Sequence, residues 1–453
     1  MHSVITRRVV VAGGVFAPGH LGELTRIVPF EMVDGVLAGC GAVQRRVRKL
    51  PARVVVYLLL AAALFEDSGY LAVWARLTGA LHGLELPTVT GAALRQARVR
   101  LGVRPMRALF DVLRGPGSAA WAAGARWRGL LVTAIDGTHL DVADSEELVG
   151  WLGKRSNNRG SAGYPKVLLL ALVACGTRTV IDVVFGPQDR SEADYAGRLV
   201  RSLDPQMIVL LDRGLSSNVF LAKVAAGGGH FLARLTANRT PPVLRRYPDG
   251  SFRSQLGGLR VRVIACEITI ATPHGRRAET YRFATTLLDH YRYPARDLAE
   301  LYHERWEIES SYYELKKTML AGRVLRSRTR TGVAQEIFAL LAVYQLLRTA
   351  ITDGVTTAAP DLDPDRASFS IALNTARDQV IQAAGVIEDG HVDLVGAIGR
   401  AVLARPMLSR RPRTSPRRVK RPLSPFAHKS LNVDRRSFKF TVSVTILTGN
   451  GGP

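Results

Sequence analysis

Four short apolar runs around one helical segment constrain the fold of this chain more than any other feature. Three of the runs, GLLVTAID (129–136), KVLLLALVACG (166–176) and TVIDVVFGP (179–187), are typical of buried strands. A segment with helical spacing, SEADYAGRLVRSL (191–203), follows and precedes the fourth run, MIVLLDRG (207–214). Three strands, a helix and a further strand predict a mixed sheet covered by helices, and therefore an α/β fold.

The rest of the chain alternates between helical and strand-like patterns. Residues 1–125 have helical spacing, and their apolar run VVVYLLLAAALF (54–65) is too short to span a bilayer and is interpreted as a buried helix. Strand-like runs in residues 229–290 predict a β insertion, and helical patterns return in residues 291–404. The final alternating run, FKFTVSVTIL (438–447), predicts a strand whose partner the pattern does not identify.

The charge of the chain indicates a polyanionic partner. Lys and Arg number 62 against 38 Asp and Glu in 453 residues, a net charge of +24. Such a surplus favours binding to nucleic acid or an anionic membrane surface, although an arginine-rich proteome would give the same balance. Residues 401–440 hold twelve Lys or Arg and one acid, so the tail at 405–453 is expected to be extended or disordered when free. The three cysteines lie far apart and predict neither a disulfide framework nor a zinc site.

The segment YHERWEIESSYYELKK (302–317) predicts a helix with a polar stripe along one side. At about 100° per residue, this stripe lies beside the apolar face and contains Tyr302, Arg305, Glu309 and Lys316. The opposite side is predicted to face solvent and contains Glu304, Glu307, Ser311, Glu314 and Thr318. An amphipathic helix needs only a core face and a solvent face, so the additional stripe calls for a function.

Two aspartates, Asp136 and Asp212, each end a run predicted to be a buried strand. Either one alone is typical of a turn residue, because Asp often begins a turn. Carboxylates at neighbouring strand ends can nevertheless converge, and Glu309 on the polar stripe can complete an oxygen site for Mg²⁺. Two such ions activate a water molecule and stabilise the leaving oxygen of a phosphodiester. Arg305 and Lys316 would then hold DNA phosphates, although Arg305 can also form an intrahelical ion pair with Glu309.

These residues resemble the signature of a known enzyme family. The pattern Y-x2-R-x3-E-x6-K at Tyr302, Arg305, Glu309 and Lys316 resembles that of DDE transposases of the insertion-element-four family. DGT at Asp136, DRG at Asp212 and TTL at 285–287 match the family pattern in the same order. With two N-terminal segments, FAPGHLGELTRIVPFEMVD and LPARVVVYLLLAAALFEDSGYLAVW, the resemblance covers roughly residues 15–350.

The resemblance implies an RNase H-like catalytic core interrupted by a β-strand insertion, with an all-helical N-terminal domain and a C-terminal helical region. Asp136, Asp212 and Glu309 would be the catalytic metal ligands, and Tyr302, Arg305 and Lys316 would contact the transposon end. The expected domains are a helical N-terminal DNA-binding domain at 1–125, the first part of the core at 126–228, the β insertion at 229–290, the second part of the core with the catalytic helix at 291–352, the C-terminal helical region at 353–404 and the basic tail at 405–453.

The implied activity is metal-dependent strand cleavage at element ends followed by strand transfer into target DNA, that is, cut-and-paste transposition. The expected cofactor is Mg²⁺, with two ions bound and Mn²⁺ able to substitute. Expected partners are double-stranded DNA and a second copy of the chain, with no membrane and a cytoplasmic, nucleoid-associated location. An inactive or domesticated DNA-binding relative and a plain metal-dependent endonuclease remain alternatives.

Hairpin formation at the DNA ends is left open by the sequence. Some relatives stack a flipped base on a Trp in the β insertion, and this insertion has no Trp. Tyr281 or Phe283 could take that part. Trp306, beside the polar stripe, either packs against the insertion or stacks on DNA.

Overall fold

The computed structural model describes residues 20–447, apart from 45, 47, 82–85, 117–121, 123, 155, 158–159, 162, 273–274, 383–394, 408–412, 415–437 and 440, together with 10–11 and 14–15. The predicted basic tail at 405–453 therefore lies largely outside the described residues.

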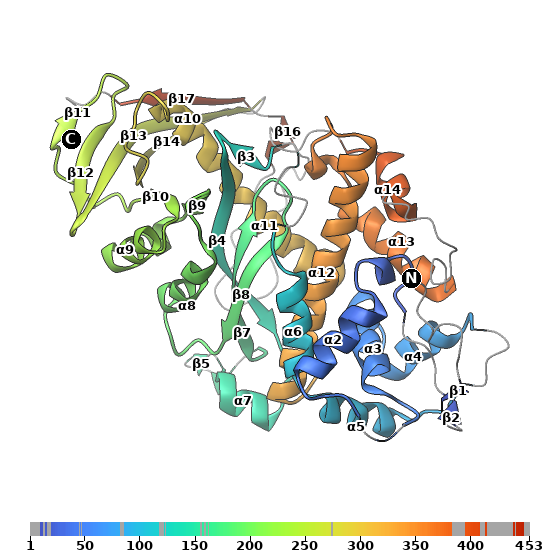
Figure 1. Ribbon diagram of the computed structural model, residues 1–453. Coiled ribbons are helices and arrows are strands. Elements are labelled where there is room, and N and C mark those ends of the chain that lie inside the picture. Colours follow the sequence, from blue (N-terminus) through green and yellow to red (C-terminus); the bar gives the residue numbers. More distant parts are fainter. Residues whose placement is uncertain are drawn as a thin grey trace.

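One large mixed sheet organises the described part of the chain (Figure 1). Its strands follow the order β11-β12-β13-β14-β10-β9-β4-β7-β8, with β3 beside β4 and β17 beside β13. The pairs β4–β9 and β9–β10 are parallel, and the others are antiparallel. The strands are β3 (Arg126–Trp127), β4 (Leu130–Asp141), β7 (Lys166–Ala174), β8 (Val180–Gly186), β9 (Met207–Leu211), β10 (His230–Arg234), β11 (Arg245–Arg246), β12 (Phe252–Leu256), β13 (Leu259–Thr272), β14 (Gly275–Thr285) and β17 (Thr441–Ile446).

Helices cover both faces of this sheet, which confirms the predicted mixed α/β architecture. On one face, α8 (Glu192–Leu199) and α9 (Asn218–Ala226) pack over a core that includes Ile135 and Leu211. On the other face, α11 (Trp306–Tyr313) and α12 (Arg330–Ala358) share a core with the strand neighbours Ala134 and Leu210. Because both faces are buried, the central strands are apolar at almost every position.

Helix α12 is the centre around which the terminal helices pack (Figure 1). It is long and apolar enough to cross a membrane, but 78% of its apolar window is buried inside the protein, as expected of a central core helix. The helices that contact it come from both ends of the chain: α3 (Ala52–Leu64), α5 (Gly91–Leu101), α6 (Arg104–Leu113), α13 (Phe369–Gln382) and α14 (Gly396–Leu403). Two further N-terminal helices, α2 (Phe30–Gly39) and α4 (Tyr70–Thr78), pack against α3. The apolar run at 54–65 thus forms the buried helix that the sequence predicted.

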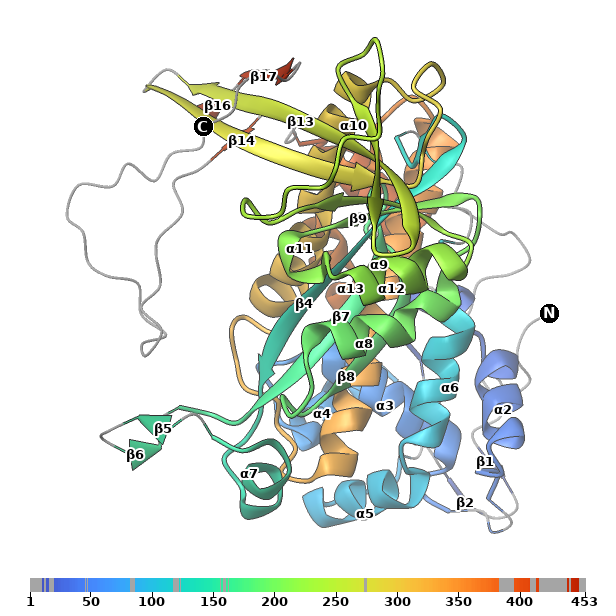
Figure 2. The same ribbon diagram turned by 90° about the vertical axis from the view of Figure 1, so that its left-hand side faces the viewer.

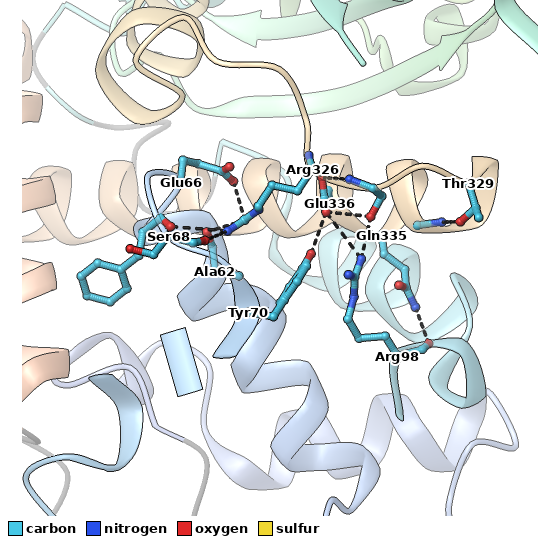
Figure 3. Close-up of polar contacts among 12 residues, drawn as sticks. Ala62, Glu66, Ser68, Tyr70, Arg98, Arg326, Thr329, Gln335 and Glu336 are labelled. Carbon is cyan, nitrogen blue, oxygen red and sulfur yellow. Dashed lines mark hydrogen bonds and ion pairs between the residues drawn. The ribbon is translucent and has the colours of Figure 1, made fainter. Parts of the chain in front are cut away.

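A buried network of hydrogen bonds connects the N-terminal helices to α12 (Figure 3). Arg326 donates hydrogen bonds to the carbonyl of Ser68 at 2.6 Å and to the carboxylate of Glu66 at 3.0 Å. Tyr70 donates to Glu336 of α12 at 2.7 Å. These bonds satisfy polar groups at the interface, so the helical N-terminal segment and the sheet body form one packed unit.

The β-rich segment at 229–290 does not form a sheet of its own. Its strand β14 pairs with β10, which lies parallel to β9, so the segment extends the central sheet at one edge. The long strands β13 and β14 reach out from the body at the top of Figure 2. The C-terminal strand β17 pairs with β13 from Cys266 to Ala271, which supplies the partner that the sequence left unidentified.

Shorter elements complete the fold. They are β1 (Val10–Val11), β2 (Gly14–Val15), η1 (Leu24–Arg26), α7 (Glu146–Leu152), β5 (Ser156–Asn157), β6 (Gly160–Ser161), η3 (Val200–Ser202), η4 (Arg213–Leu215), α10 (Ala295–Leu301), η5 (Tyr302–Arg305), η6 (Glu314–Met319), η7 (Pro364–Arg366), β15 (Arg413–Thr414) and β16 (Phe438–Lys439).

Candidate active site

The register of two parallel strands brings Asp136 and Asp212 side by side. The pairing between β4 and β9 ends at Ile135 opposite Leu211, so the two aspartates are the next residues on neighbouring strands. Asp212 follows the end of β9, as predicted. The prediction that Asp136 ends its strand is wrong, because antiparallel pairing with β7 carries β4 on to Asp141. Asp136 therefore lies where β4 no longer pairs with β9 but still pairs with β7.

Helix α11 brings the third predicted carboxylate to the same place. Arg305, immediately before α11, donates to Glu309 at 2.9 Å and lies 3.4 Å from the Asp136 carboxylate. Tyr312 fixes the helix to the sheet: its hydroxyl donates to the Asp136 carbonyl at 2.6 Å and accepts from the Ala171 amide at 3.1 Å. These contacts orient α11 so that Glu309 faces β4.

Burial and neighbouring charges both act on the carboxylate of Asp136. The pKa of Asp136 is raised to about 6, chiefly by burial. The amide of Gly137 and the guanidinium of Arg305 oppose the rise, and the negative charges of Asp212 and Glu309 add to it. Asp212 also acts as a turn residue, since its Oδ1 accepts from the amides of Gly214 and Leu215. Asp212 can therefore be both a turn residue and a residue of the candidate site.

The donor set has the chemistry of a divalent-cation site. Carboxylates from β4, from the end of β9 and from α11 are the oxygen ligands that Mg²⁺ and Mn²⁺ prefer. As the described residues stand, no group of three or more Asp, Glu, His or Cys is arranged to hold a metal ion. The guanidinium of Arg305 bridges Asp136 and Glu309 and neutralises both carboxylates.

Lys316 points toward the same strand from a π-helical turn. The helix was predicted to be α-helical through this region, but residues Glu314–Met319 form a π-helix, which shifts the register of the turn. Lys316 nevertheless donates to Thr138 at 3.1 Å, two residues along β4 from Asp136. The side chain of Lys316 therefore still lies on the polar-stripe side of the helix, as predicted.

The aromatic residues around the site are mostly enclosed. Tyr302 is only 8% exposed, and its hydroxyl donates to the Leu211 carbonyl at 3.2 Å, beside Asp212. Its ring packs on Phe283, which is fully buried and so is not available to stack a base in this structure. The DNA contact predicted for Tyr302 stays a prediction. Trp306 is 36% exposed and lies at the surface beside Arg305.

The side of the 302–317 segment that was predicted to face solvent is partly buried, so that prediction is wrong for Glu307, Ser311 and Glu314. Arg178, at the turn between β7 and β8, pairs with Glu307 at 2.7 Å and with Glu314 at 3.0 Å. Arg348 of α12 also pairs with Glu314. Burial is possible because these arginines supply the opposite charge.

A fourth carboxylate approaches the site from the other face of the sheet. Glu192, the first residue of α8, lies against Gly137 and close enough to Asp212 for that charge to raise its pKa, after burial as the main cause. No sequence pattern indicated a function for Glu192, because acidic residues are common in the first turn of helices.

Comparisons with known proteins identify the family of this chain. A family model described as "Insertion element 4 transposase N-terminal" matches residues 18–111, and one described as "Transposase DDE domain" matches residues 127–346. The transposase InsG for insertion sequence element IS4 of Escherichia coli (strain K12) is 27% identical over 334 residues, 70% of this chain and 74% of that protein. A second protein of that strain, InsZ, is 26% identical over 188 residues, 41% of this chain and 61% of its own length.

Among solved structures, a piggyBac transposase synaptic complex with hairpin DNA aligns with a TM-score of 0.40 and 12% identity, over 86% of this chain and 82% of that one. A similarity at that level carries no argument about fold or mechanism. The two family models and the InsG relative carry the assignment: the chain belongs to the insertion-element-four family of DDE transposases and is a DNA transposase.

Proposed function

We propose that this transposase cleaves DNA at the ends of its own element and transfers the freed ends into target DNA, with Asp136, Asp212 and Glu309 as the metal-binding carboxylates. The register of β4 and β9 supports this proposal most strongly, since it sets Asp136 beside Asp212. The bonds of Arg305 to both Asp136 and Glu309 link the third carboxylate to the pair.

The DDE domain implies dependence on divalent metal ions, and we propose Mg²⁺ as the physiological ion, with two ions bound and Mn²⁺ able to substitute. When bound, such ions activate the attacking oxygen and stabilise the leaving 3′-oxygen of the phosphodiester. In cleavage, water attacks the phosphorus and the bond to the 3′-oxygen breaks. In strand transfer, the freed 3′-hydroxyl attacks a target phosphodiester and displaces its 3′-oxygen.

Arg305 and Lys316 are proposed to hold the DNA end. Lys316 is anchored on Thr138, which lies about 7 Å along the strand from Asp136 at about 3.3 Å per residue. A lysine there suits a phosphate one or two nucleotides from the cut. Arg305 would exchange its bond to Asp136 for a DNA phosphate once a metal neutralises that carboxylate. Tyr302 is enclosed next to Asp212. This position favours a role for Tyr302 in holding the end of β9 over a contact with DNA.

The wider assembly follows the same proposal. The sheet from β4 to β9 with α8 and α11 would be an RNase H-like core, interrupted by β insertion residues 229–290 and preceded by a helical DNA-binding domain at 1–125. Joining two ends in one reaction requires at least two active sites, so we propose a homodimer on DNA. A cytoplasmic, nucleoid-associated location without a membrane partner is part of this proposal.

The test uses the full chain and a duplex taken from the DNA that flanks its gene. Asp136→Asn, Asp212→Asn and Glu309→Gln should each abolish single-turnover cleavage and strand transfer while leaving duplex binding intact, because ligation and phosphate contact are separate roles. The exposed Glu300→Gln serves as the matched control. Full cleavage by any of the three variants would remove that residue from the site, and cleavage without transfer by the wild type would indicate a plain endonuclease.

A further inference from the structure

Helix α5 differs from the other described helices in its charge. It carries three arginines, Arg95, Arg98 and Arg100, and no acidic residue, whereas every other α-helix of the described residues holds at most two Lys or Arg. A basic residue in the last turn complements the helix dipole, which accounts for Arg98 and Arg100. Arg95 lies in the middle of the helix, so the dipole does not explain it.

The inner face of α5 is fixed to the body of the protein. Arg98 donates a hydrogen bond to Ser327 at 2.8 Å and lies 3.5 Å from Glu336 of α12 (Figure 3). Gln335 of α12 donates to the carbonyls of Arg98 at 2.8 Å and Gly102 at 2.7 Å, where the helix ends. These bonds hold α5 on a rigid support with its outer face toward solvent. The inner face also buries three apolar residues, Leu94, Ala97 and Leu101.

The outer face of α5 has polar and apolar residues at its centre and arginines at its sides. At about 100° per residue, Ala92, Gln96 and Val99 follow the centre line, with Arg95 on one side and Arg100 on the other. All five are exposed, and Val99 is 73% exposed. The side chains of Arg95, Gln96 and Arg100 form neither a hydrogen bond nor an ion pair with other described residues. This face is therefore ready for an external partner.

The same pattern matches what the major groove of DNA presents to a helix. The groove admits an α-helix, a glutamine can form paired hydrogen bonds with adenine, and an apolar side chain can contact the methyl group of thymine. Arginines on the two sides of the helix can hold the phosphates that border the groove. An acidic protein surface would also attract the arginines, but it would not use Gln96 and Val99 at the centre.

Exposed cations continue from α5 toward the candidate active site. Ser327, which accepts the bond from Arg98, lies in the segment between η6 and α12. Arg323 and Arg328 of this segment are exposed. In Figures 1 and 2, α5 lies at the same end of the molecule as α7, the helix that follows β4. A duplex on α5 thus has a basic path along Arg328 and Arg323 toward Lys316.

We propose that α5 is the helix that reads the element end. It lies in the major groove of duplex DNA, with Gln96 and Val99 against base edges and Arg95 and Arg100 against phosphates. The inference rests on the proposed DNA-binding role of residues 1–125, and it names the helix and the side chains that discriminate between sequences. DNA bound in this way covers the exposed valine and neutralises the two arginines.

The experiment measures binding of the full chain by fluorescence anisotropy at several salt concentrations. The probes are a duplex taken from the DNA that flanks its gene and a shuffled duplex of the same composition. Gln96→Ala should weaken binding to the flanking duplex by about tenfold, the size expected of a lost base contact, and leave the shuffled duplex unaffected. Arg95→Ala and Arg100→Ala should weaken both duplexes alike, and each should lower the slope of log affinity against log salt by about 1.

Matched controls come from exposed residues elsewhere on the chain. Gln255→Ala on β12 is the control for Gln96, and Arg296→Ala on α10 is the control for the arginines; neither should change binding. Melting temperatures should be unchanged in all of these variants, because the side chains are exposed. Flanking duplexes with single base-pair substitutions give a sharper measure. Wild type should lose affinity at a base pair where Gln96→Ala loses none, and that base pair is the one that Gln96 reads.

The outcomes separate this inference from the proposed function. A selective loss on the flanking duplex in Gln96→Ala, with unchanged melting, supports the reading helix. Wild-type binding by Gln96→Ala, or an equal loss on both duplexes, overturns it. If the α5 variants bind normally while Asp136→Asn abolishes cleavage, the inference about α5 fails and the proposed catalytic site stands. Full cleavage by Asp136→Asn refutes that site and leaves the binding result for α5 unaffected.

Discussion

The guanidinium of Arg305 donates a hydrogen bond to the carboxylate of Glu309 at 2.9 Å. The same guanidinium lies 3.4 Å from Asp136, which is 169 residues away in the sequence. One arginine therefore neutralises two of the three carboxylates proposed to bind metal. A cation bound at the proposed site would have to compete with Arg305, which would couple the proposed metal and DNA roles through this side chain.

Replacing Arg305 should reveal that competition. In Arg305→Gln, Asp136 and Glu309 lose their shared hydrogen-bond donor, so the metal-free protein should be about 1–3 kcal/mol less stable. Mn²⁺ should then raise the melting temperature of the variant more than that of the wild type, while DNA cleavage falls. Melting curves with and without Mn²⁺ measure both effects. An equal Mn²⁺-induced shift in the two proteins would contradict the competition, and Arg296→Gln, on an exposed ion pair, is the control.

Lys316 should matter for DNA cleavage and little for folding. Its side chain is half-buried and bonded to Thr138, an arrangement worth at most about 1 kcal/mol. Lys316→Ala should impair single-turnover cleavage of an end duplex and leave melting nearly unchanged. The exposed neighbour Lys317→Ala should change neither cleavage nor melting. Wild-type cleavage by Lys316→Ala would make this lysine a solvated residue, and a large melting loss would make it structural.

Arg178 should be among the residues on which stability depends most. It is buried and pairs with Glu307, Glu314 and Asp365, so its removal leaves three carboxylates without their shared partner. Arg178→Met should cost about 3–5 kcal/mol in urea unfolding. Adding Glu314→Gln to that variant should recover part of the loss, since it removes one uncompensated charge. A cost below 1 kcal/mol, the size expected for an exposed pair, would show that the network does not hold the helix.

The hydrogen-bond network between the N-terminal helices and α12 predicts a pH dependence of stability through Glu66. Burial is the main reason that the pKa of Glu66 is raised to about 7, with Glu336 adding to the rise and Arg326, Arg377 and Arg323 opposing it. Because the folded-state pKa exceeds the ordinary value of 4.5, the folded state binds the proton more tightly than the unfolded state. The contribution of Glu66 to stability is therefore fully present below pH 4.5 and is lost as the pH rises to about 7.

Glu66→Gln tests this linkage directly. The amide keeps an acceptor for Arg326 and removes the buried charge, so the variant should be more stable than the wild type above pH 7, by about 1–3 kcal/mol. The difference should shrink as the pH falls toward 4.5. Unfolding free energies measured across that range, with the exposed Glu300→Gln as control, check the sign. A variant that is less stable than wild type at pH 8 would show that the Glu66–Arg326 ion pair outweighs burial.

The sequence predicted the central strands and the three carboxylates because those signals are local. Asp136 and Asp212 each follow an apolar run long enough to be a strand, and the motif spacing around Glu309 is contained in one helix. The continuation of β4 beyond Asp136 was missed, since the residues after it read as a polar turn. They form strand because β7 is available as a partner up to Lys166.

Burial of Glu307 and Glu314 could not be read from the sequence, because charge on a helix face normally indicates solvent. Their partner Arg178 lies 129 and 136 residues away, in a turn with no distinguishing pattern. The approach of Glu192 to Gly137 was invisible for the same reason: it depends on how α8 crosses the sheet. Long-range charge pairing and packing, rather than local propensity, decided these features.

The position of the metal ions in the DNA-bound protein is the most direct test of the account. Crystals or frozen complexes of the full chain with an end duplex and Mn²⁺ would locate the ion, by its anomalous scattering in the crystal case. We expect Mn²⁺ within about 2.0–2.5 Å of carboxylate oxygens of Asp136 and Asp212, with Arg305 moved from Asp136 to a DNA phosphate. Mn²⁺ bound away from these aspartates, or Arg305 still bridging Asp136 and Glu309 in a cleavage-competent complex, would contradict it.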